Sequence, residues 1–321
     1  MATQSNLNNA KAAKNDEFYT RLCDIESELS HYRQHFVRQT VFCNCDDPEW
    51  SNFWRYFHVN FADLGLKKLI STHYDVSGNS SYMMEYLGGN DLDISDGIVT
   101  PLLGNGDFRS DESIALLSQA DVVVTNPPFS LFRAYINQLV VHDKKFLIIG
   151  NKNSVTYKDV FPLLQNNIVW LGFDSPSEFD TPNGLSKKVS GLCRWFTNLD
   201  IAKRHEPFFD LESIHAQYTG NEDQYPKYKN YDAINVETTD DIPEDYFGVM
   251  GVPISFLDKY NPDDFEILEC HEPAVDLRLL EKLPKFKPYK SRQLMIDGVL
   301  CQKRYHRIFI RRKITQKGDC E

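Results

Sequence analysis

Short apolar runs alternate with longer amphipathic stretches over residues 15–200 of the chain. Runs rich in β-branched residues predict strands at residues 40–45, 67–74, 121–125 and 144–150. Between these runs, apolar residues recur at helical spacing and predict helices at residues 15–36, 51–66 and 130–143, and a turn that leads into a helix at residues 104–120. Strands that alternate with helices predict a parallel sheet covered by helices.

Local signals place the ends of several of these elements. Asp16 is placed to cap helix 15–36, and Gly65 to end helix 51–66. The polar stretch at residues 75–103 predicts irregular structure. Two further apolar runs predict a closing pair of strands at residues 167–173 and 192–199, with a mobile loop at residues 173–191 between them.

The stretch "DVVVTNPPFS" at residues 121–130 predicts a buried strand that ends abruptly in a loop. In open α/β sheets, ligands bind at this end of the strands. The Asn126 amide oxygen and the Pro127 carbonyl are hydrogen-bond acceptors, and Phe129 adds an aromatic face. This set suits a planar group with an exocyclic amine, such as a nucleobase, and needs no general base before attack. The alternative is a plain turn that ends a strand.

Composition indicates an ordinary globular protein, since 41% of the 321 residues are hydrophobic and 25% are charged. Charged residues interrupt every apolar stretch, and the first residues lack an apolar signal core, so we expect no membrane span and a cytoplasmic location. The seven cysteines include no CxxC pair. We therefore expect no disulfide framework and no metal site.

Charge is distributed unevenly along the chain. The net charge is −11, but residues 281–317 contain 12 Lys and Arg against two acids, which gives +10 there and −21 elsewhere. Such a segment is typical of phosphate binding, and a solvated basic terminus is the alternative. At the other end, residues 1–14 are polar and predict a disordered arm.

Many stretches besides this loop resemble the EcoRI-type adenine-specific DNA methyltransferases. They run from about residue 15 to residue 268: "NDEFYT", "CDIE", "CNCDDP", "LGLKKLI", "GDFRS", "TNPPFSLF", "KKFLII", "TNLD", "YPKY", "NYDAINV", "GVMGVPI" and "FLDKYNP". The resemblance implies an α/β fold with a doubly wound, Rossmann-like class I methyltransferase sheet. It also implies an S-adenosylmethionine-binding catalytic domain at residues 15–200 and a C-terminal DNA target-recognition region at residues 201–321. The cofactor motifs precede the catalytic loop, as in the gamma arrangement of these enzymes.

The resemblance also implies roles for single residues. Those that would hold the target adenine are Asn126, Pro127, Pro128 and Phe129. Those that would bind the cofactor are Tyr19 and Thr20 at its methionine part, Asp47 with Pro48 at its ammonium group, Asp75 at its ribose, and Asp107 and Phe108 at its adenine. Two departures stand out, because Arg21 replaces a common proline, and Ser51 and Phe53 replace the usual glycines. For each acid, a cap or a solvated loop residue is the alternative.

The implied reaction is methyl transfer from S-adenosylmethionine to N6 of adenine in duplex DNA, with base flipping. GAATTC is the first site to test, as in restriction–modification. Trp195 or Phe196 would stack on the far face of the flipped base, or else belong to the core. Tyr225, Lys227 and Tyr228 combine aromatic faces with a cation, which suits DNA contact, and a packed surface loop is the alternative.

The resemblance further implies a functional monomer that does not require a cognate restriction endonuclease. Two other functions stay open. One is an amino-methyltransferase for RNA or protein glutamine, because related loops bind those groups too. The other is a non-catalytic DNA-binding relative, since the usual glycines of the cofactor loop are absent.

Overall fold

The structure is a computed structural model that describes residues 19–180, 186–211, 214–228, 232–271, 293–296, 299–302 and 307–314. The predicted arm at residues 1–14 lies outside the described residues, as does much of the basic segment 281–317. Along the described parts of the chain, no helix has the length and apolar character needed to cross a membrane. Within the same parts, no three His, Cys, Asp or Glu side chains gather in a way that could hold a metal ion.

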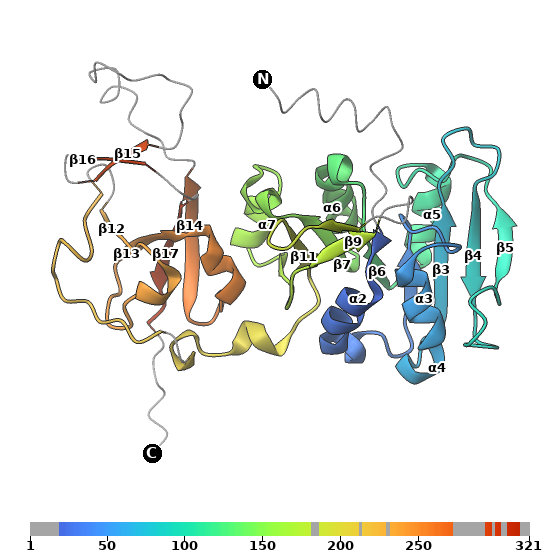
Figure 1. Ribbon diagram of the computed structural model, residues 1–321, viewed down its shortest axis with the longest axis horizontal. Helices are drawn as coiled ribbons and strands as arrows, with labels where there is room; N and C mark the ends of the chain where they lie inside the picture. Colours follow the sequence, from blue (N-terminus) through green and yellow to red (C-terminus); the bar gives the residue numbers. More distant parts are fainter. Residues whose placement is uncertain are drawn as a thin grey trace. The chain divides into compact units, whose positions relative to one another are not determined.

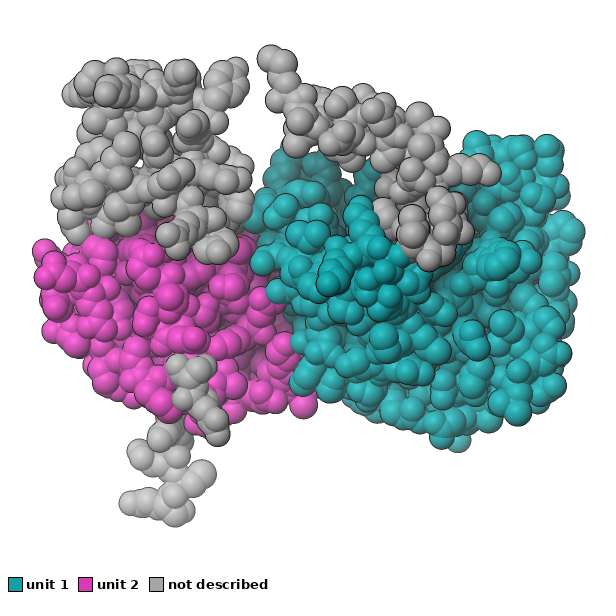
Figure 2. All heavy atoms as spheres, viewed as in Figure 1, with its two compact units in different colours: residues 1–160, 169–200 teal, residues 161–168, 201–321 magenta. Residues whose placement is uncertain are grey.

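The chain divides into two compact units, which Figure 2 colours separately. Unit 1 comprises residues 1–160 and 169–200, and unit 2 comprises residues 161–168 and 201–321. The main division therefore falls between Asp200 and Ile201.

An eight-stranded mixed sheet forms the centre of unit 1 (Figure 1). Its strands lie in the order β5 (Ile98–Pro101), β4 (Tyr82–Tyr86), β3 (Lys68–His73), β2 (Thr40–Cys43), β6 (Val122–Thr125), β7 (Lys145–Asn151), β11 (Cys193–Thr197) and β8 (Trp170–Leu171). The central strands β3, β2, β6 and β7 are parallel, and the flanking strands are antiparallel to their neighbours. The four predicted strands and the closing pair of β8 with β11 are confirmed.

The order of the strands places a change of winding at the middle of the sheet. The chain passes from β2 to β3 on one side, and it later returns as β6 on the other side of β2. Every residue of β2 and β6 is buried. Crevices outside the carboxyl ends of such strands bind ligands in open α/β sheets.

Helices pack on both faces of this sheet. They are α2 (Leu22–Leu29), α3 (Asn52–Val59), α4 (Phe61–Leu64), α5 (Asp111–Gln119) and α6 (Phe132–Val141). Trp195 of β11 packs edge-on against Phe53 of α3, with ring centroids 6.0 Å apart. Its neighbour Phe196 packs against Phe132 of α6 at 4.9 Å. Because successive side chains of a strand point to opposite faces, α3 and α6 cover opposite faces of the sheet.

Side-chain caps explain where two helices begin. The Ser51 hydroxyl accepts the Phe53 N–H at 3.0 Å, and the Ser110 hydroxyl accepts the Ser113 N–H at 3.1 Å. Gly65 ends α4 with φ +62°, a conformation that glycine adopts without strain. The helix predicted at residues 130–143 and the turn and helix predicted at residues 104–120 are confirmed, and the helix predicted at residues 51–66 is divided into α3 and α4 at Asn60.

Three predictions about local structure were wrong in part. Residues 75–103 contain β4 and β5 rather than only irregular chain. The predicted helix at residues 15–36 begins only at Leu22, because Tyr19–Thr20 form strand β1. The predicted mobile loop contains β9 (Glu178–Asp180) and β10 (Ser186–Lys188), which form a three-stranded sheet with β1.

An ion pair strengthens this small sheet. Arg21, which directly follows β1, lies 2.6 Å from Glu178 and 3.3 Å from Asp180 of β9. Residue pairing brings Thr20 opposite Phe179. A pairing between segments so distant in sequence has no local signal, which explains why the pattern of the chain did not predict it.

Unit 2 contains a second, smaller sheet. Its strands lie in the order β12 (Ala233–Asn235), β13 (Val249–Pro253), β17 (Arg307–Arg312) and β14 (Phe265–His271), and the unit also contains α7 (Phe161–Gln165) and the hairpin of β15 (Gln293–Ile296) with β16 (Val299–Gln302). The rings of Phe208, Phe256 and Phe265 pack at centroid distances of 5.0 to 5.6 Å in its core. The assignment of target recognition to this region stays a prediction.

Candidate active site

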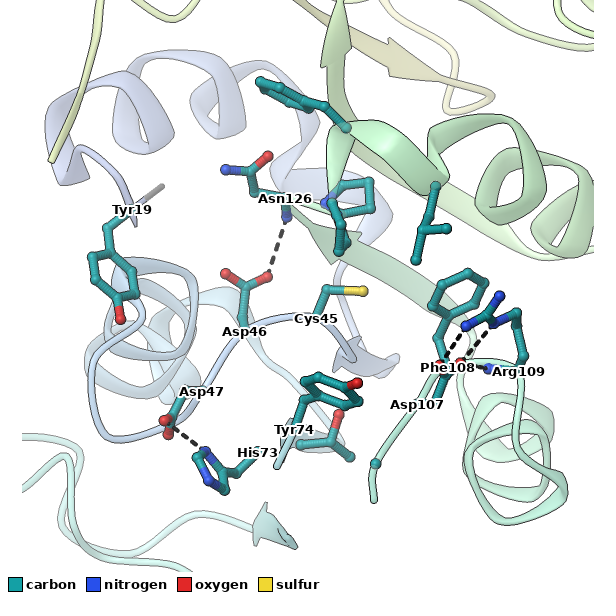
Figure 3. A pocket seen from close by; sticks show the side chains of 16 residues that line it. Tyr19, Cys45, Asp46, Asp47, His73, Tyr74, Asp107, Phe108, Arg109 and Asn126 are labelled. Atoms are coloured by element: carbon teal, nitrogen blue, oxygen red, sulfur yellow. Dashed lines mark hydrogen bonds and ion pairs between the residues drawn. The ribbon is translucent and has the colours of Figure 1, made fainter. Parts of the chain in front are cut away.

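A pocket of about 260 Å³ opens in unit 1 (Figure 3). Its lining comes from the turn after β2, the end of β3, the turn before α5 and the loop after β6, and Tyr19 of β1 completes it. Because β2, β3 and β6 are parallel, their carboxyl ends meet at this edge of the sheet. The pocket thus lies beside the change of winding, and it unites segments that are distant in sequence.

The loop after β6 brings Asn126, Pro127, Pro128 and Phe129 to this pocket. Pro127 is buried and Phe129 is half-buried at the start of a short 3-10 helix, Phe129–Leu131. The Asn126 N–H donates to Asp46 Oδ2 at 3.2 Å. The backbone of the loop is therefore fixed from the β2 side of the pocket (Figure 3).

Asp46 is a residue of the pocket that sequence reasoning missed. Its carboxylate is buried and accepts hydrogen bonds from the Ser51 hydroxyl at 2.9 Å, the Thr125 hydroxyl and the Asn126 N–H. Burial raises the pKa of Asp46 to about 6, although these hydrogen bonds lower it. The only signal in the sequence was its position beside Asp47, after a predicted strand.

Asp47 lines the pocket, and two aromatic side chains contact its carboxylate. Its Oδ2 lies 2.8 Å from His73 Nδ1, and its Oδ1 accepts the Tyr82 hydroxyl at 3.2 Å. The rings of His73 and Tyr82 stack with centroids 5.0 Å apart. Pro48, the next residue, is not among the residues that line the pocket.

Asp107 and Phe108 also line the pocket. Arg109 forms a two-pronged ion pair with Asp107, with Nε to Oδ1 at 2.9 Å and Nη2 to Oδ2 at 2.6 Å. Hydrogen bonds from Arg109 lower the pKa of Asp107 below its ordinary value. Phe108 is nearly buried and packs edge-on against Tyr135, with centroids 5.0 Å apart. A carboxylate and an aromatic ring are thus held side by side at this wall.

Gly106 lets the turn that holds Asp107 and Phe108 lie close to the end of β3. Its φ is +77°, and a Cβ there would lie 2.7 Å from the backbone oxygen of His73. A side chain at this position would therefore force the two walls apart.

The predicted cofactor residues Tyr19 and Thr20 have different surroundings. Tyr19 lines the pocket, whereas Thr20 is buried and lies outside the lining. The Thr20 carbonyl accepts from Asn52 Nδ2 at 2.8 Å, which ties β1 to the start of α3.

Asp75 is not among the residues of the pocket. Its carboxylate accepts the N–H groups of Ser77, Asn79 and Ser80 and the hydroxyls of both serines. These bonds lower its pKa. Asp75 therefore stabilises its own turn, which was the alternative interpretation of this acid, and the end of β3 contributes His73 and Tyr74 to the pocket instead.

The expectation that Trp195 or Phe196 stacks on a flipped base is wrong. Both side chains are fully buried in β11, an interior strand of the sheet, where α3 and α6 cover them. The ring that approaches Phe129 is Phe179 of β9, with centroids 6.1 Å apart. Sequence reasoning missed this residue because it lies in the segment expected to be a mobile loop.

In unit 2, Tyr225 and Tyr228 are buried rather than displayed for stacking. The Tyr225 hydroxyl donates to the Asp241 carbonyl at 2.9 Å, and the Tyr228 hydroxyl donates to Asn235 Oδ1 at 2.6 Å. Lys227 between them is exposed. The two tyrosines are therefore core residues, and only the lysine has the exposure that contact with DNA requires.

Comparison with known proteins finds one matching family and several similar relatives. Residues 6–313 match the model of a family described as "Adenine-specific methyltransferase EcoRI". The Type II methyltransferase M.EcoRI of Escherichia coli is 48% identical over 316 residues, which cover 89% of this chain and 96% of the relative. M.MgeORF184P of Mycoplasma genitalium and M.MpnI of Mycoplasma pneumoniae, also Type II methyltransferases, are each 38% identical and cover 96% of this chain and 98% of their own lengths.

No solved structure matches the chain. The family model nevertheless spans nearly the whole sequence, including the loop after β6 and both acidic turns of the pocket. The chain therefore belongs to the EcoRI family of adenine-specific methyltransferases.

Proposed function

We propose that this adenine-specific DNA methyltransferase transfers a methyl group from S-adenosylmethionine to N6 of a flipped adenine in duplex DNA. The observation that carries the proposal is the pocket that Asn126, Asp47 and Asp107 share. We assign the sheet of unit 1 to the Rossmann-like, doubly wound class I methyltransferase fold. The change of winding beside the pocket, with α3 and α6 on opposite faces, supports this assignment.

The chemistry of the pocket fits S-adenosylmethionine. Its carboxylates suit a ligand that bears an ammonium and a sulfonium, and Phe108 suits a planar adenine. In this proposal Asp47 holds the ammonium, Asp107 accepts from the adenine amine, and Tyr19 closes over the methionine part. When bound, the cofactor supplies a methyl group on a positively charged sulfur, which becomes a neutral thioether as the methyl leaves.

Asn126, Pro127 and Phe129 hold the target base in this proposal. The Asn126 amide oxygen and the Pro127 carbonyl accept the two amine hydrogens, while Phe129 stacks on the ring. The amine nitrogen becomes positively charged as it bonds to the methyl carbon, and the two fixed acceptors stabilise that charge. The nitrogen then releases one proton to water.

Recognition of the DNA sequence is assigned to residues 201–321. A duplex cannot expose the adenine amine without extrusion of the nucleotide, so this region has to hold the flanking DNA while the base enters unit 1. GAATTC is the first sequence to test, because the chain resembles M.EcoRI. We further propose that the protein acts as a cytoplasmic monomer and needs no partner endonuclease for methylation.

The test is single-molecule sequencing of plasmid DNA from cells that lack other adenine methylation. Cells that express the wild-type chain should show N6-methyladenine in one sequence context, and cells that express Asn126→Ala should show none. Calorimetry on both purified proteins should give similar affinities for S-adenosylmethionine. Unmodified DNA with soluble wild-type protein would overturn the proposal, and an assay with RNA would then follow.

A further inference from the structure

Asp46 joins three parts of the pocket. It follows β2, its Oδ1 accepts the hydroxyl of Ser51 at the start of α3, and its Oδ2 accepts from Thr125 and Asn126 at the end of β6. The Ser71 hydroxyl of β3 donates to the Asp46 carbonyl. One buried side chain thus contacts both the turn that holds Asp47 and the loop that holds Asn126.

In all the hydrogen bonds of the Asp46 side chain, the carboxylate is the acceptor. The Cys45 N–H donates to Thr125 Oγ1 at 3.2 Å, so the Thr125 hydroxyl is left to donate its own proton to Asp46. The Asn126 N–H donates to the same carboxylate oxygen. An ionised carboxylate accepts all these bonds, whereas a protonated acid or an amide carries its own donor hydrogens and accepts fewer of them.

We propose that Asp46 is a positioning residue for methyl transfer: its ionised carboxylate fixes the backbone at Asn126 and so directs the Asn126 side chain and the Pro127 carbonyl toward the target amine. The proposal rests on the proposed function. The carboxylate also accepts a hydrogen bond from the Asn126 N–H, and in the proposed function the Asn126 side chain binds the amine nitrogen that gains positive charge during transfer. In a buried site this negative charge favours the charged product over the neutral reactant.

The charged state of Asp46 gives this role a pH signature. The titratable groups that face it are Asp47, Cys43, Cys45 and Tyr135. Burial raises the pKa of both thiols and of Tyr135 above their ordinary values, so these groups stay neutral at neutral pH. Since the pKa of Asp46 is about 6, its carboxylate becomes protonated as the pH falls below that value. The rate constant for transfer should fall with it.

The experiment compares wild-type protein with Asp46→Asn, which keeps the shape of the side chain and removes its charge. Single-turnover methylation is measured on a GAATTC duplex, or on unmethylated plasmid DNA if that duplex is not a substrate, from pH 5 to pH 8. Calorimetry gives the Kd of S-adenosylmethionine, and scanning calorimetry gives the Tm. The matched control is Glu28→Gln, which removes another buried acid of unit 1 that lies outside the pocket.

We expect Asp46→Asn to lower the single-turnover rate constant by roughly 10- to 100-fold at pH 7.5, which is less than the roughly 100- to 1,000-fold for loss of a group that touches the reacting atoms, because Asp46 acts through Asn126. The Kd of the cofactor should stay within about threefold, because the side chain that we assign to its ammonium is Asp47. The acidic limb of the pH profile should disappear in this variant and persist in Glu28→Gln. An unchanged rate constant or a retained acidic limb would overturn the role. A lower rate constant that is accompanied by a lower Tm and by a comparable loss of cofactor affinity would also overturn it, because the variant would then be generally destabilised.

Thr125→Val keeps the inference testable if Asp46→Asn does not fold. Valine has nearly the same shape and continues the apolar strand, but it cannot donate to Asp46. Because the Thr125 hydrogen bond lowers the pKa of Asp46, its removal should shift the acidic limb to higher pH. A limb that does not move would count against Asp46. Inactive wild-type protein on every DNA tested would instead overturn the proposed function, and the inference with it.

Discussion

Phe129 and Phe179 face each other in unit 1, with ring centroids 6.1 Å apart and ring planes tilted by 46°. Phe129 belongs to the loop after β6 and is half-buried, whereas Phe179 is fully buried in β9. Two rings that enclose a base need a separation of about 7 Å, twice the roughly 3.5 Å between stacked atoms. A flipped adenine would fit between them if the two rings turned parallel and moved apart to this separation.

We predict that Phe179→Leu weakens capture of the flipped base. Leucine preserves most of the apolar volume but removes the aromatic face, and stacking contributes about 1–3 kcal/mol per base. The single-turnover rate constant should fall by roughly 5- to 150-fold, because 1.4 kcal/mol corresponds to a factor of about ten. Fluorescence of 2-aminopurine at the target position, which rises when a base leaves the stack, should increase less than with wild-type protein.

The control for this prediction is Phe196→Leu. Phe196 is equally buried but packs against Phe132 in the core, so its replacement should lower the Tm and leave the fluorescence increase intact. If Phe179→Leu captures the base as well as wild-type protein does, Phe179 is not the second stacking face.

The parts of the fold that the sequence predicted have local causes. In β6 the run "VVVT" is buried throughout, and after Asn126 the chain continues with Pro127 and Pro128, which lack the N–H that a strand needs. Asp107 and Phe108 directly precede a helix with a serine cap, and such a turn is recognisable without any tertiary information. These features sufficed to predict the loop after β6 and the turn before α5, both of which line the pocket.

The parts that the sequence did not predict depend on contacts between distant segments. The strands β1 and β9 are short, and β1 pairs only with β9, a segment about 160 residues away, while β9 also pairs with β10. Asp46 and Asp47 are adjacent acids of the same type, and only the fold determines which one is buried against Asn126. An aromatic residue in a strand, such as Trp195, gives no sign of whether its face meets the core or a ligand.

We predict that Lys227 and Tyr228 affect the protein in different ways. Tyr228→Phe removes the hydrogen bond to Asn235 and should destabilise unit 2 by about 1–2 kcal/mol, without changing the affinity for DNA. Lys227→Ala should leave the Tm unchanged. If the exposed Lys227 meets a phosphate, this variant should reduce the slope of log K against log salt concentration by about 1. Scanning calorimetry and DNA binding at several salt concentrations would separate the two effects.

The contact between Asp107 and Arg109 predicts how cofactor binding depends on pH. Arg109 lowers the pKa of Asp107, so the carboxylate of the wild-type protein stays ionised to a lower pH than an unpaired aspartate does. Arg109→Ala should therefore bind S-adenosylmethionine with an affinity within about threefold of wild type at pH 7.5. As the pH is lowered, the variant should begin to lose affinity at a higher pH than wild-type protein does. Calorimetry at pH 7.5, 5.5 and 4.5 would measure this change.

A second variant tests the acceptor itself. Asp107→Ala should weaken cofactor binding by roughly tenfold or more at every pH, because a hydrogen bond to a charged group contributes about 1.5–3 kcal/mol. Wild-type affinity in Asp107→Ala would remove Asp107 from the cofactor site, whatever the outcome for Arg109→Ala.

Glu28 of α2 is an acid buried away from the pocket. Its carboxylate accepts the N–H groups of Phe173 at 2.8 Å and Asp174 at 2.6 Å, and the hydroxyl of Tyr32 at 2.8 Å. Burial raises the pKa of Glu28 from 4.5 to about 7 in spite of these bonds. The folded protein therefore binds an additional proton between these two pH values, and its free energy of unfolding falls as the pH rises through this window.

We predict that this fall amounts to about 3 kcal/mol in unit 1 and that Glu28→Gln removes it, since one pKa unit corresponds to about 1.4 kcal/mol. All four tryptophans, Trp50, Trp54, Trp170 and Trp195, lie in unit 1, so their fluorescence reports the unfolding of this unit. Urea titrations at pH 5, 6, 7 and 8 would give the free energy of unfolding of both proteins. Asp46 contributes a similar dependence to wild type and variant alike, so the difference between the two curves isolates Glu28. Curves that stay parallel from pH 5 to pH 7 would show that Glu28 does not titrate in this window.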